Sequence, residues 1–130
     1  MTSLIAIACG GALGALGRHF LAHWVMGWAG GGFPWGIFLV NVVGCFLMGI
    51  LIEGLSRFGT PFAEARAFLS VGLLGAFTTF STFSMDSVLL IERGQWLAAA
   101  GYIVGSVVLA IGGLYLGMAL VRLLVGSAGA

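Results

Sequence analysis

Four long apolar segments constrain this chain more than any other feature of its sequence. Hydrophobic residues make up 61% of the 130 residues and charged residues 7%, whereas an average soluble domain has about 25% charged residues. Polar side chains are too few to cover a soluble surface. A helix needs about 20 largely apolar residues to cross a hydrocarbon core roughly 30 Å thick. The segments that meet this condition cover about 4–25, 36–52, 67–91 and 97–124.

These segments predict an all-α membrane protein, with residues 1–130 forming a single four-helix transmembrane domain. Glycines and Pro34 predict a first loop within 26–35, whose tryptophans suit a membrane interface. Glu53–Arg66 holds several of the charged residues and is predicted to be the main polar connection. ERGQW, residues 92–96, predicts a tight turn. The net charge of +1 argues against a nucleic-acid partner.

Many of the 23 glycines are spaced so that they share a helix face. Small residues four apart let two helix backbones approach closely in a membrane. Glycine is also simply common in membrane helices, but its recurrence on several spans favours tight packing and oligomerisation. The pairs are Gly10 and Gly14, Gly101 and Gly105, and Gly113 and Gly117.

The arginines show only a weak bias toward one of the two predicted sides of the membrane. With four spans, Arg57, Arg66 and Arg122 share one side, and Arg93 lies on the other, joined by Arg18 if that side chain reaches the first loop. Orientation follows the excess of Lys and Arg on the cytoplasmic side, and this excess is small. We therefore expect the chain to insert in both orientations and to pair as an inverted dimer.

Polar side chains also lie within the predicted spans, where they are energetically costly. A charge at a helix centre costs about 2.5–3.5 kcal/mol on insertion scales, so Arg18 either reaches the headgroups or attracts an anion at a pore mouth. The Asn41 side chain either forms a hydrogen bond from one helix to another or lines a pore as a hydrogen-bond donor. Tyr102 and Ser106 are four apart and share a face. Together these residues place hydrogen-bond donors on three spans, enough to line a narrow path.

The histidines and cysteines give weaker indications. His19 and His23 are one helical turn apart, a spacing that can hold a metal ion, but without a third ligand interfacial histidines are the favoured interpretation. Cys9 and Cys45 lie in apolar runs and form no Cys-x-x-Cys motif. A buried apolar role is therefore favoured for both cysteines over a disulfide or a metal site.

The stretch GAFTTFSTFS, residues 75–84, combines phenylalanines and hydroxyls at high density. Phe77, Phe80 and Phe83 are three apart and are predicted to form one slowly drifting helix face. The edge of an aromatic ring is electropositive, so these rings either pack in a core or meet a small anion in a conduit. The hydroxyls of Thr78, Ser81 and Thr82 are predicted on another face.

Gly75, close to two consecutive threonines, predicts that the third helix is broken near its middle. A break at membrane depth frees backbone carbonyls, which can coordinate a cation if protein buries them. The stretch contains no Asp or Glu, so any such site would use carbonyl oxygens rather than carboxylates.

At these residues the sequence resembles the Fluc/CrcB family of small fluoride channels. GGALGALGRHF, residues 10–20, resembles the first-span motif of the family, and GIFLVNVVGCFLMG, residues 36–49, resembles its second-span asparagine motif. GLLGAFTTFSTFS, residues 72–84, resembles the most specific third-span signature. Tyr102 followed by Ser106 resembles the polar face of the fourth span, so the likeness extends over nearly the whole chain.

The resemblance implies an antiparallel, dual-topology homodimer in the inner membrane of a prokaryote. Two pores would conduct fluoride passively, and the family exports fluoride that enters cells as weakly acidic HF. A structural sodium ion would lie at the dimer centre, held by the backbone carbonyls of Gly75 and Thr78 from each subunit. Ser81 and Thr82 match a hydroxyl track, and Arg18 matches the basic residue of the first span. The positions that match pore-lining residues are Asn41, Phe80, Phe83, Tyr102 and Ser106.

The chain departs from the family pattern at positions near the implied pore. Ile37 replaces a frequent Thr, and Ala110 offers no second serine, so we expect these losses to affect the conduction rate. Selectivity should persist because Asn41, Phe80 and Phe83 remain. The other departures are His19 where Tyr is frequent, Leu73 where Phe is frequent and Asp86 where Glu is common.

The alternative from another functional class is a small, dual-topology, proton-coupled drug exporter. Such a transporter needs an intramembrane carboxylate, and the nearest candidate is Asp86, close to the end of its span. Arg18 has the wrong sign for a cationic substrate. A packing subunit without transport would leave the donors on three spans unexplained. The sequence has no nucleophile–base pair and no phosphate-binding loop, so we expect no enzymatic activity.

Overall fold

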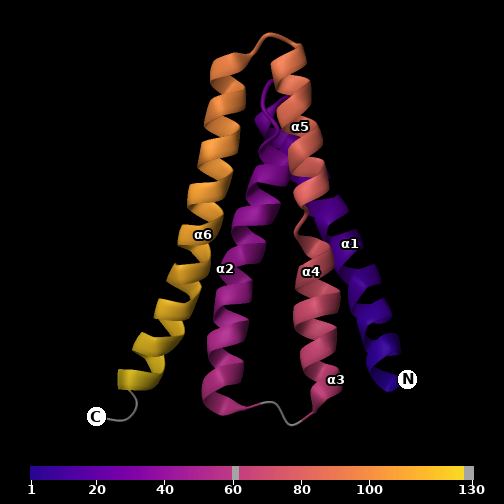
Figure 1. The fold of residues 1–130 in the computed structure, drawn as a ribbon, viewed down its shortest axis with the longest axis vertical. Helices are drawn as coiled ribbons and strands as arrows, with labels where there is room; N and C mark the ends of the chain where they lie inside the picture. Colours follow the sequence, from indigo (N-terminus) through magenta and orange to yellow (C-terminus); the bar gives the residue numbers. More distant parts are fainter. Residues whose placement is uncertain (60–61, 128–130) are drawn as a thin grey trace.

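The computed structural model describes residues 1–59 and 62–127, and the regular structure in this part of the chain is helical (Figure 1). Four helical segments in it are long and apolar enough to cross a membrane, as the sequence predicted. The third segment consists of four consecutive pieces. The elements are α1 (Thr2–Ala29), α2 (Trp35–Phe58), α3 (Ala63–Arg66), the π-helical η1 (Ala67–Leu74), α4 (Gly75–Phe77), α5 (Phe80–Glu92) and α6 (Trp96–Ser127).

Left-handed glycines follow three of these helices and end them. Gly30, Gly59 and Gly94 have φ between 72° and 75°, a conformation that glycine adopts without steric cost. The turn predicted within 92–96 is confirmed. The polar connection predicted over Glu53–Arg66 is shorter than expected, because α2 continues to Phe58. The predicted boundary was wrong because charged residues occupy the last turn of this helix.

The helices converge at one end of the molecule and separate toward the end that carries both described termini (Figure 1). α2 packs most extensively on α6, and α1 packs on η1 and α4. Beyond the break in the third segment, α5 packs on α6. The third segment therefore contacts α1 through its first half and α6 through its second half, with α2 between them.

Glycines allow the two main helix pairs to approach at backbone distance. A Cβ atom on Gly10 would lie 2.5 Å from the carbonyl oxygen of Phe68, and one on Gly14 would overlap the carbonyl of Leu73. On the other pair, a Cβ on Gly117 would overlap the carbonyl of Phe46. The predicted tight packing is confirmed at these positions. At Gly101 a Cβ would meet no atom within 4 Å, so the structure gives this glycine no close packing partner.

The third segment is broken at Thr78 and Thr79, whose backbones are extended (φ/ψ −80°/154° and −150°/124°). The predicted break is confirmed, but it lies three residues after Gly75, which is itself helical. The prediction that Phe77, Phe80 and Phe83 share one helix face is wrong, because the break separates the first ring from the other two. Phe77 instead lies close to Gly44 of α2.

Asn41 holds the two sides of this break together. Its Oδ1 accepts a hydrogen bond from the Thr79 backbone N–H at 2.8 Å, and its Nδ2 donates to the Thr79 carbonyl at 3.0 Å. The side-chain amide thus replaces two hydrogen bonds that the extended residue cannot make within a helix. Since lipid offers no partner for backbone polar groups, α2 supplies the partner that makes the break possible.

A buried carboxylate joins α2 to α6 near the splayed end. Glu53 is 7% exposed, and its two oxygens accept hydrogen bonds from Arg57 Nε at 2.8 Å and Arg122 Nη2 at 2.9 Å. Both arginines retain solvent-exposed surface. Glu53 and Arg57 are one turn apart on α2, whereas the pair between Glu53 and Arg122 links α2 to α6 near the ends of the two helices.

We expect Gly117→Ala to destabilise the chain by about 1–3 kcal/mol, because the added methyl group meets the backbone of Phe46 rather than a movable side chain. Gly112→Ala is the matched control on the same helix, since a Cβ there meets nothing within 4 Å. The thermal midpoint of the detergent-solubilised protein measures both. Equal midpoints for the two variants would contradict the packing of α6 on α2.

We expect Asn41→Ala to destabilise the break, since each unsatisfied buried polar group costs about 1–3 kcal/mol. The variant leaves both the N–H and the carbonyl of Thr79 without the side-chain amide. Hydrogen–deuterium exchange should show faster exchange around Thr79, together with a lower thermal midpoint. Val43→Ala, at an exposed position on the same helix, is the control. Unchanged exchange around Thr79 in Asn41→Ala would contradict this assignment.

Candidate functional site

A groove of about 360 Å³ lies beside the break, between α2, the third segment and α6. We call it the central groove. Its lining residues include no Asp, Glu, Lys or Arg, so its polar groups are neutral. The residues that line the groove are Asn41 and Cys45 from α2, Gly75, Thr78, Thr79, Phe80 and Phe83 from the third segment, and Ser106, Val107 and Ala110 from α6.

Ser106 contributes a buried hydroxyl to the groove. The residue is 5% exposed, and its Oγ has no hydrogen-bond partner among the described residues. Asn41 contributes a further donor, since its amide nitrogen carries two hydrogens and one of them reaches Thr79. Buried polar groups are nearly always paired, so two donors from facing helices mark the groove as a place for a polar ligand.

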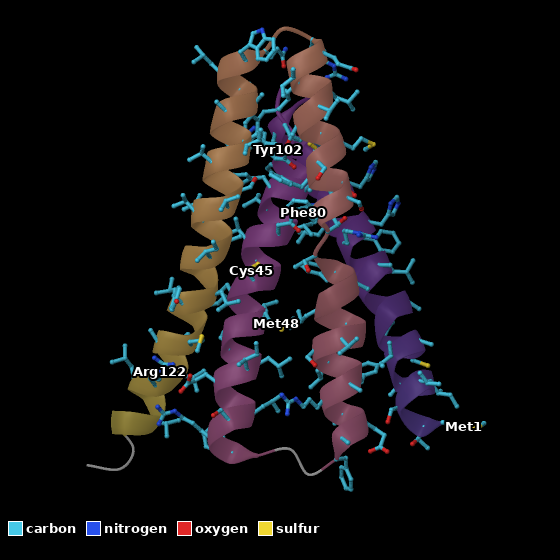
Figure 2. The ribbon with its side chains drawn as sticks, in the orientation of Figure 1. Met1, Cys45, Met48, Phe80, Tyr102 and Arg122 are labelled. Atoms are coloured by element: carbon cyan, nitrogen blue, oxygen red, sulfur yellow. The ribbon has the colours of Figure 1, made fainter. Side chains whose placement is uncertain are left out.

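Phe80 and Phe83 line the same groove at the level of α5, and Tyr102 packs against Phe83 beyond it. The Phe80 and Phe83 centroids are 5.3 Å apart with their planes tilted by 43°, and the Phe83 and Tyr102 centroids are also 5.3 Å apart. Figure 2 shows Cys45, Phe80 and Tyr102 at successive levels of the bundle between α2, α5 and α6. Phe83 and Tyr102 are buried, whereas Phe80 is 76% exposed.

Tyr102 does not line the central groove but closes the bundle above it. Its ring meets those of Phe33, Phe38 and Phe83 at centroid distances of 5.3–6.3 Å. Its hydroxyl donates to Asp86 Oδ2 at 3.3 Å. The predicted face shared by Tyr102 and Ser106 is therefore directed inward, with the tyrosine packed among rings and the serine in the groove.

The Thr79 hydroxyl is the centre of a small network at the start of α5. Its Oγ1 accepts a hydrogen bond from the Thr82 backbone N–H at 3.3 Å and so caps the helix. The same oxygen lies 3.2 Å from Ser81 Oγ and 3.1 Å from Thr82 Oγ1. The predicted hydroxyl track of Ser81 and Thr82 is thus connected to the break through Thr79.

The break leaves two carbonyls without their usual helical donors. In a continuous helix the N–H of residue 79 would donate to Gly75 and that of residue 82 to Thr78. Here the first donates to Asn41 Oδ1 and the second to Thr79 Oγ1. The carbonyl oxygens of Gly75 and Thr78, both of which belong to groove-lining residues, have therefore lost the donors that a continuous helix would give them.

A second cavity of about 480 Å³ lies between α1, α2 and α5, and we call it the outer cavity. It contains the ionisable groups that the central groove lacks. Arg18, His19 and His23 line it from α1, and Thr82 and Asp86 line it from α5. The predicted Arg18 is half-buried there rather than directed at the central groove.

The structure brings most of the predicted site residues together and distributes the others around them. Asn41, Gly75, Thr78, Phe80, Phe83 and Ser106 share the central groove. Thr82 and Arg18 share the outer cavity, and Ser81 lies on the exposed side of α5.

The sequence interpretation missed three residues of structural importance. Thr79 is the most connected residue of the break, and its signal was the pair of consecutive threonines. Glu53 was assigned to a loop, although its spacing of four from Arg57 is typical of a helical ion pair. Cys45 lines the groove, and its position one helical turn after Asn41 could have indicated this.

One protein family resembles this chain over most of its length. The sequence model for the family described as CrcB-like protein, Camphor Resistance (CrcB), matches residues 5–118. A protein of Rhodospirillum centenum named fluoride-specific ion channel FluC is 47% identical over 94% of this chain and 97% of its own length. Proteins with the same name from Nitrobacter winogradskyi and Agrobacterium fabrum are 46% and 45% identical, over 95% and 94% of this chain and 98% of their own lengths.

The relatives match nearly the whole chain, and the family match over residues 5–118 reaches all four apolar helical segments. They confirm the resemblance that the span motifs indicated. The four segments and the shared family together indicate a multi-pass membrane protein. The chain belongs to the CrcB family, whose curated relatives are named fluoride-specific ion channels.

Proposed function

We propose that this protein is a fluoride-selective channel that conducts the ion passively across a bacterial inner membrane. The observation that carries the proposal is the unpaired Ser106 hydroxyl, buried in the central groove opposite Asn41. The names of the relatives support the same ion. The neutral lining favours conduction over catalysis, since it offers no acid, base or nucleophile pair.

Fluoride is small and strongly hydrated, so a pore must replace its water with hydrogen-bond donors. The Ser106 hydroxyl and the free Asn41 N–H can do this, and the electropositive edges of Phe80 and Phe83 extend the same surface. Conduction also requires that the ion leaves each site. A groove lined without a cationic side chain binds the anion weakly enough to release it.

The outer cavity would serve as the approach to this path. Arg18 supplies the positive charge that draws an anion toward the bundle, and Thr82 faces the cavity from the helix that carries the phenylalanines. Ser81 and Thr82, linked to the Thr79 hydroxyl, would continue the polar track past the break. Tyr102 would line the path from its position beside Phe83.

The channel is proposed to be an inverted homodimer with two pores. Phe80 is 76% exposed in the single chain although it lines the groove, so a second copy that covers this ring would complete the wall. The weak charge bias between the loops supports insertion in both orientations. Cysteines placed singly in loops would then react with reagents from both sides of the membrane.

A structural sodium ion at the centre of that dimer fits the freed carbonyls. Hard cations prefer oxygen ligands, and the Gly75 and Thr78 carbonyls have lost their helical donors. Two carbonyls from each of two subunits would hold the ion without a carboxylate. Bound there, the ion would stabilise the breaks of both subunits against each other.

Fluoride efflux from liposomes tests the proposal, with valinomycin and a potassium gradient to set the voltage. We expect fast, valinomycin-dependent release of fluoride and no release of chloride. If folded protein released no more fluoride than protein-free liposomes, the proposal would be wrong. Proton-coupled drug transport that depends on Asp86 would instead favour the exporter.

Ser106→Ala should slow fluoride efflux about tenfold or more, because a hydrogen bond to a charged partner is worth about 1.5–3 kcal/mol. The variant removes only the hydroxyl and leaves the fold of α6 intact. Ser70→Ala is the matched control, since the Ser70 hydroxyl donates to the backbone carbonyl of Arg66 one turn earlier and lies outside the groove. Equal efflux rates for wild type and Ser106→Ala would remove Ser106 from the path.

A further inference from the structure

The outer cavity contains a pair of imidazoles that the proposed fluoride path does not use. His19 and His23 lie one turn apart on α1, and their rings are nearly parallel, with planes 11° apart and centroids 6.3 Å apart. Both side chains are exposed and line the cavity. Neither forms a hydrogen bond with another described residue, so their ring nitrogens are available to a ligand.

We propose that His19 and His23 form a two-histidine site for a divalent transition-metal ion such as Zn²⁺ or Cu²⁺. Two histidines four residues apart on a helix project from one face and can bind the same ion. Zn–N bonds are about 2.0–2.1 Å long, and at a tetrahedral angle two rings that share an ion have centroids roughly 5 Å apart, which is closer than the observed 6.3 Å. Rotation of two exposed side chains brings both nitrogens onto one ion.

The surroundings determine what kind of site this is. Among the described residues, no cluster of three His, Cys, Asp or Glu side chains is close enough to hold a metal together. The ion therefore keeps water in its remaining positions, as an open and exchangeable site. Arg18 in the same cavity opposes a cation and Asp86 favours one, so the two charges offset each other and the imidazoles determine the affinity.

Imidazole suits Zn²⁺, Cu²⁺ and Ni²⁺, whereas Mg²⁺ and Ca²⁺ prefer oxygen ligands. The site would therefore discriminate against the abundant hard cations. This chemistry differs from that proposed for the Gly75 and Thr78 carbonyls, which would hold sodium.

Copper binding to the purified full-length protein tests the site directly. These are the only two histidines in the chain, so any imidazole nitrogen coupling in the Cu²⁺ electron paramagnetic resonance spectrum must come from them. The protein should be purified with a tag that contains no histidine. A background with Cys9→Ala and Cys45→Ala removes competing thiols. We expect coupling from two nitrogens to each bound ion.

Single variants distinguish one shared ion from two separate ones. A shared ion predicts that His19→Gln and His23→Gln each lower the Cu²⁺ affinity at least tenfold, with coupling from one nitrogen remaining. Independent imidazoles predict instead that each variant halves the number of bound ions and leaves the affinity unchanged, which would overturn the proposal. Absence of nitrogen coupling in the parent protein would also overturn it.

A matched control and an independent readout complete the test. Gln95→Ala, at an exposed turn position away from the cavity, should leave the affinity unchanged, and size-exclusion profiles report whether each variant is folded. Because metal binding is measured without fluoride, its result stands whether or not the protein conducts that ion.

Discussion

A helix broken inside a membrane exposes backbone N–H and C=O groups that lipid cannot satisfy, and in this chain the side-chain amide of Asn41 satisfies those of Thr79. The rest of the structure depends on this pairing. It holds α2 against the third segment at the depth where that segment changes direction. Beyond the break, α5 is free to pack on α6, whereas the first half of the segment stays on α1. The central groove is the space that this change of partner creates.

The same pairing determines which groups the groove presents. Because the Thr79 N–H donates to Asn41 and the Thr82 N–H donates to the Thr79 hydroxyl, the carbonyls of Gly75 and Thr78 lose their helical partners. Across the groove, the Ser106 hydroxyl has no hydrogen-bond partner in the part of the chain that the structure describes. Acceptors thus collect at the break and donors at the facing helices. A cation and an anion can therefore use neighbouring parts of one neutral surface, which is the arrangement that the proposed sodium site and fluoride path require.

Hydropathy and glycine spacing predicted the four spans and the close approach of their backbones, since both patterns follow from one helix at a time. The interruption could be predicted from Gly75 and the threonines, but its location could not, because it depends on which residue of α2 lies opposite. For the same reason Phe77 was placed with Phe80 and Phe83. The charge of Glu53 suggested a loop, whereas two arginines from different helices make its burial possible. The spacing of residues along one helix does not predict which residues pair between helices. Most of the site residues were predicted from the family resemblance.

A neutral groove with placed hydrogen-bond donors should pass fluoride and exclude larger halides. The reversal potential of the purified protein in a planar bilayer, with fluoride on one side and chloride on the other, tests this most directly. We expect a macroscopic current that reverses near the value for a membrane permeable to fluoride alone, and that follows the fluoride gradient when the chloride concentration is changed. A reversal potential near zero, or one that follows chloride, would contradict it.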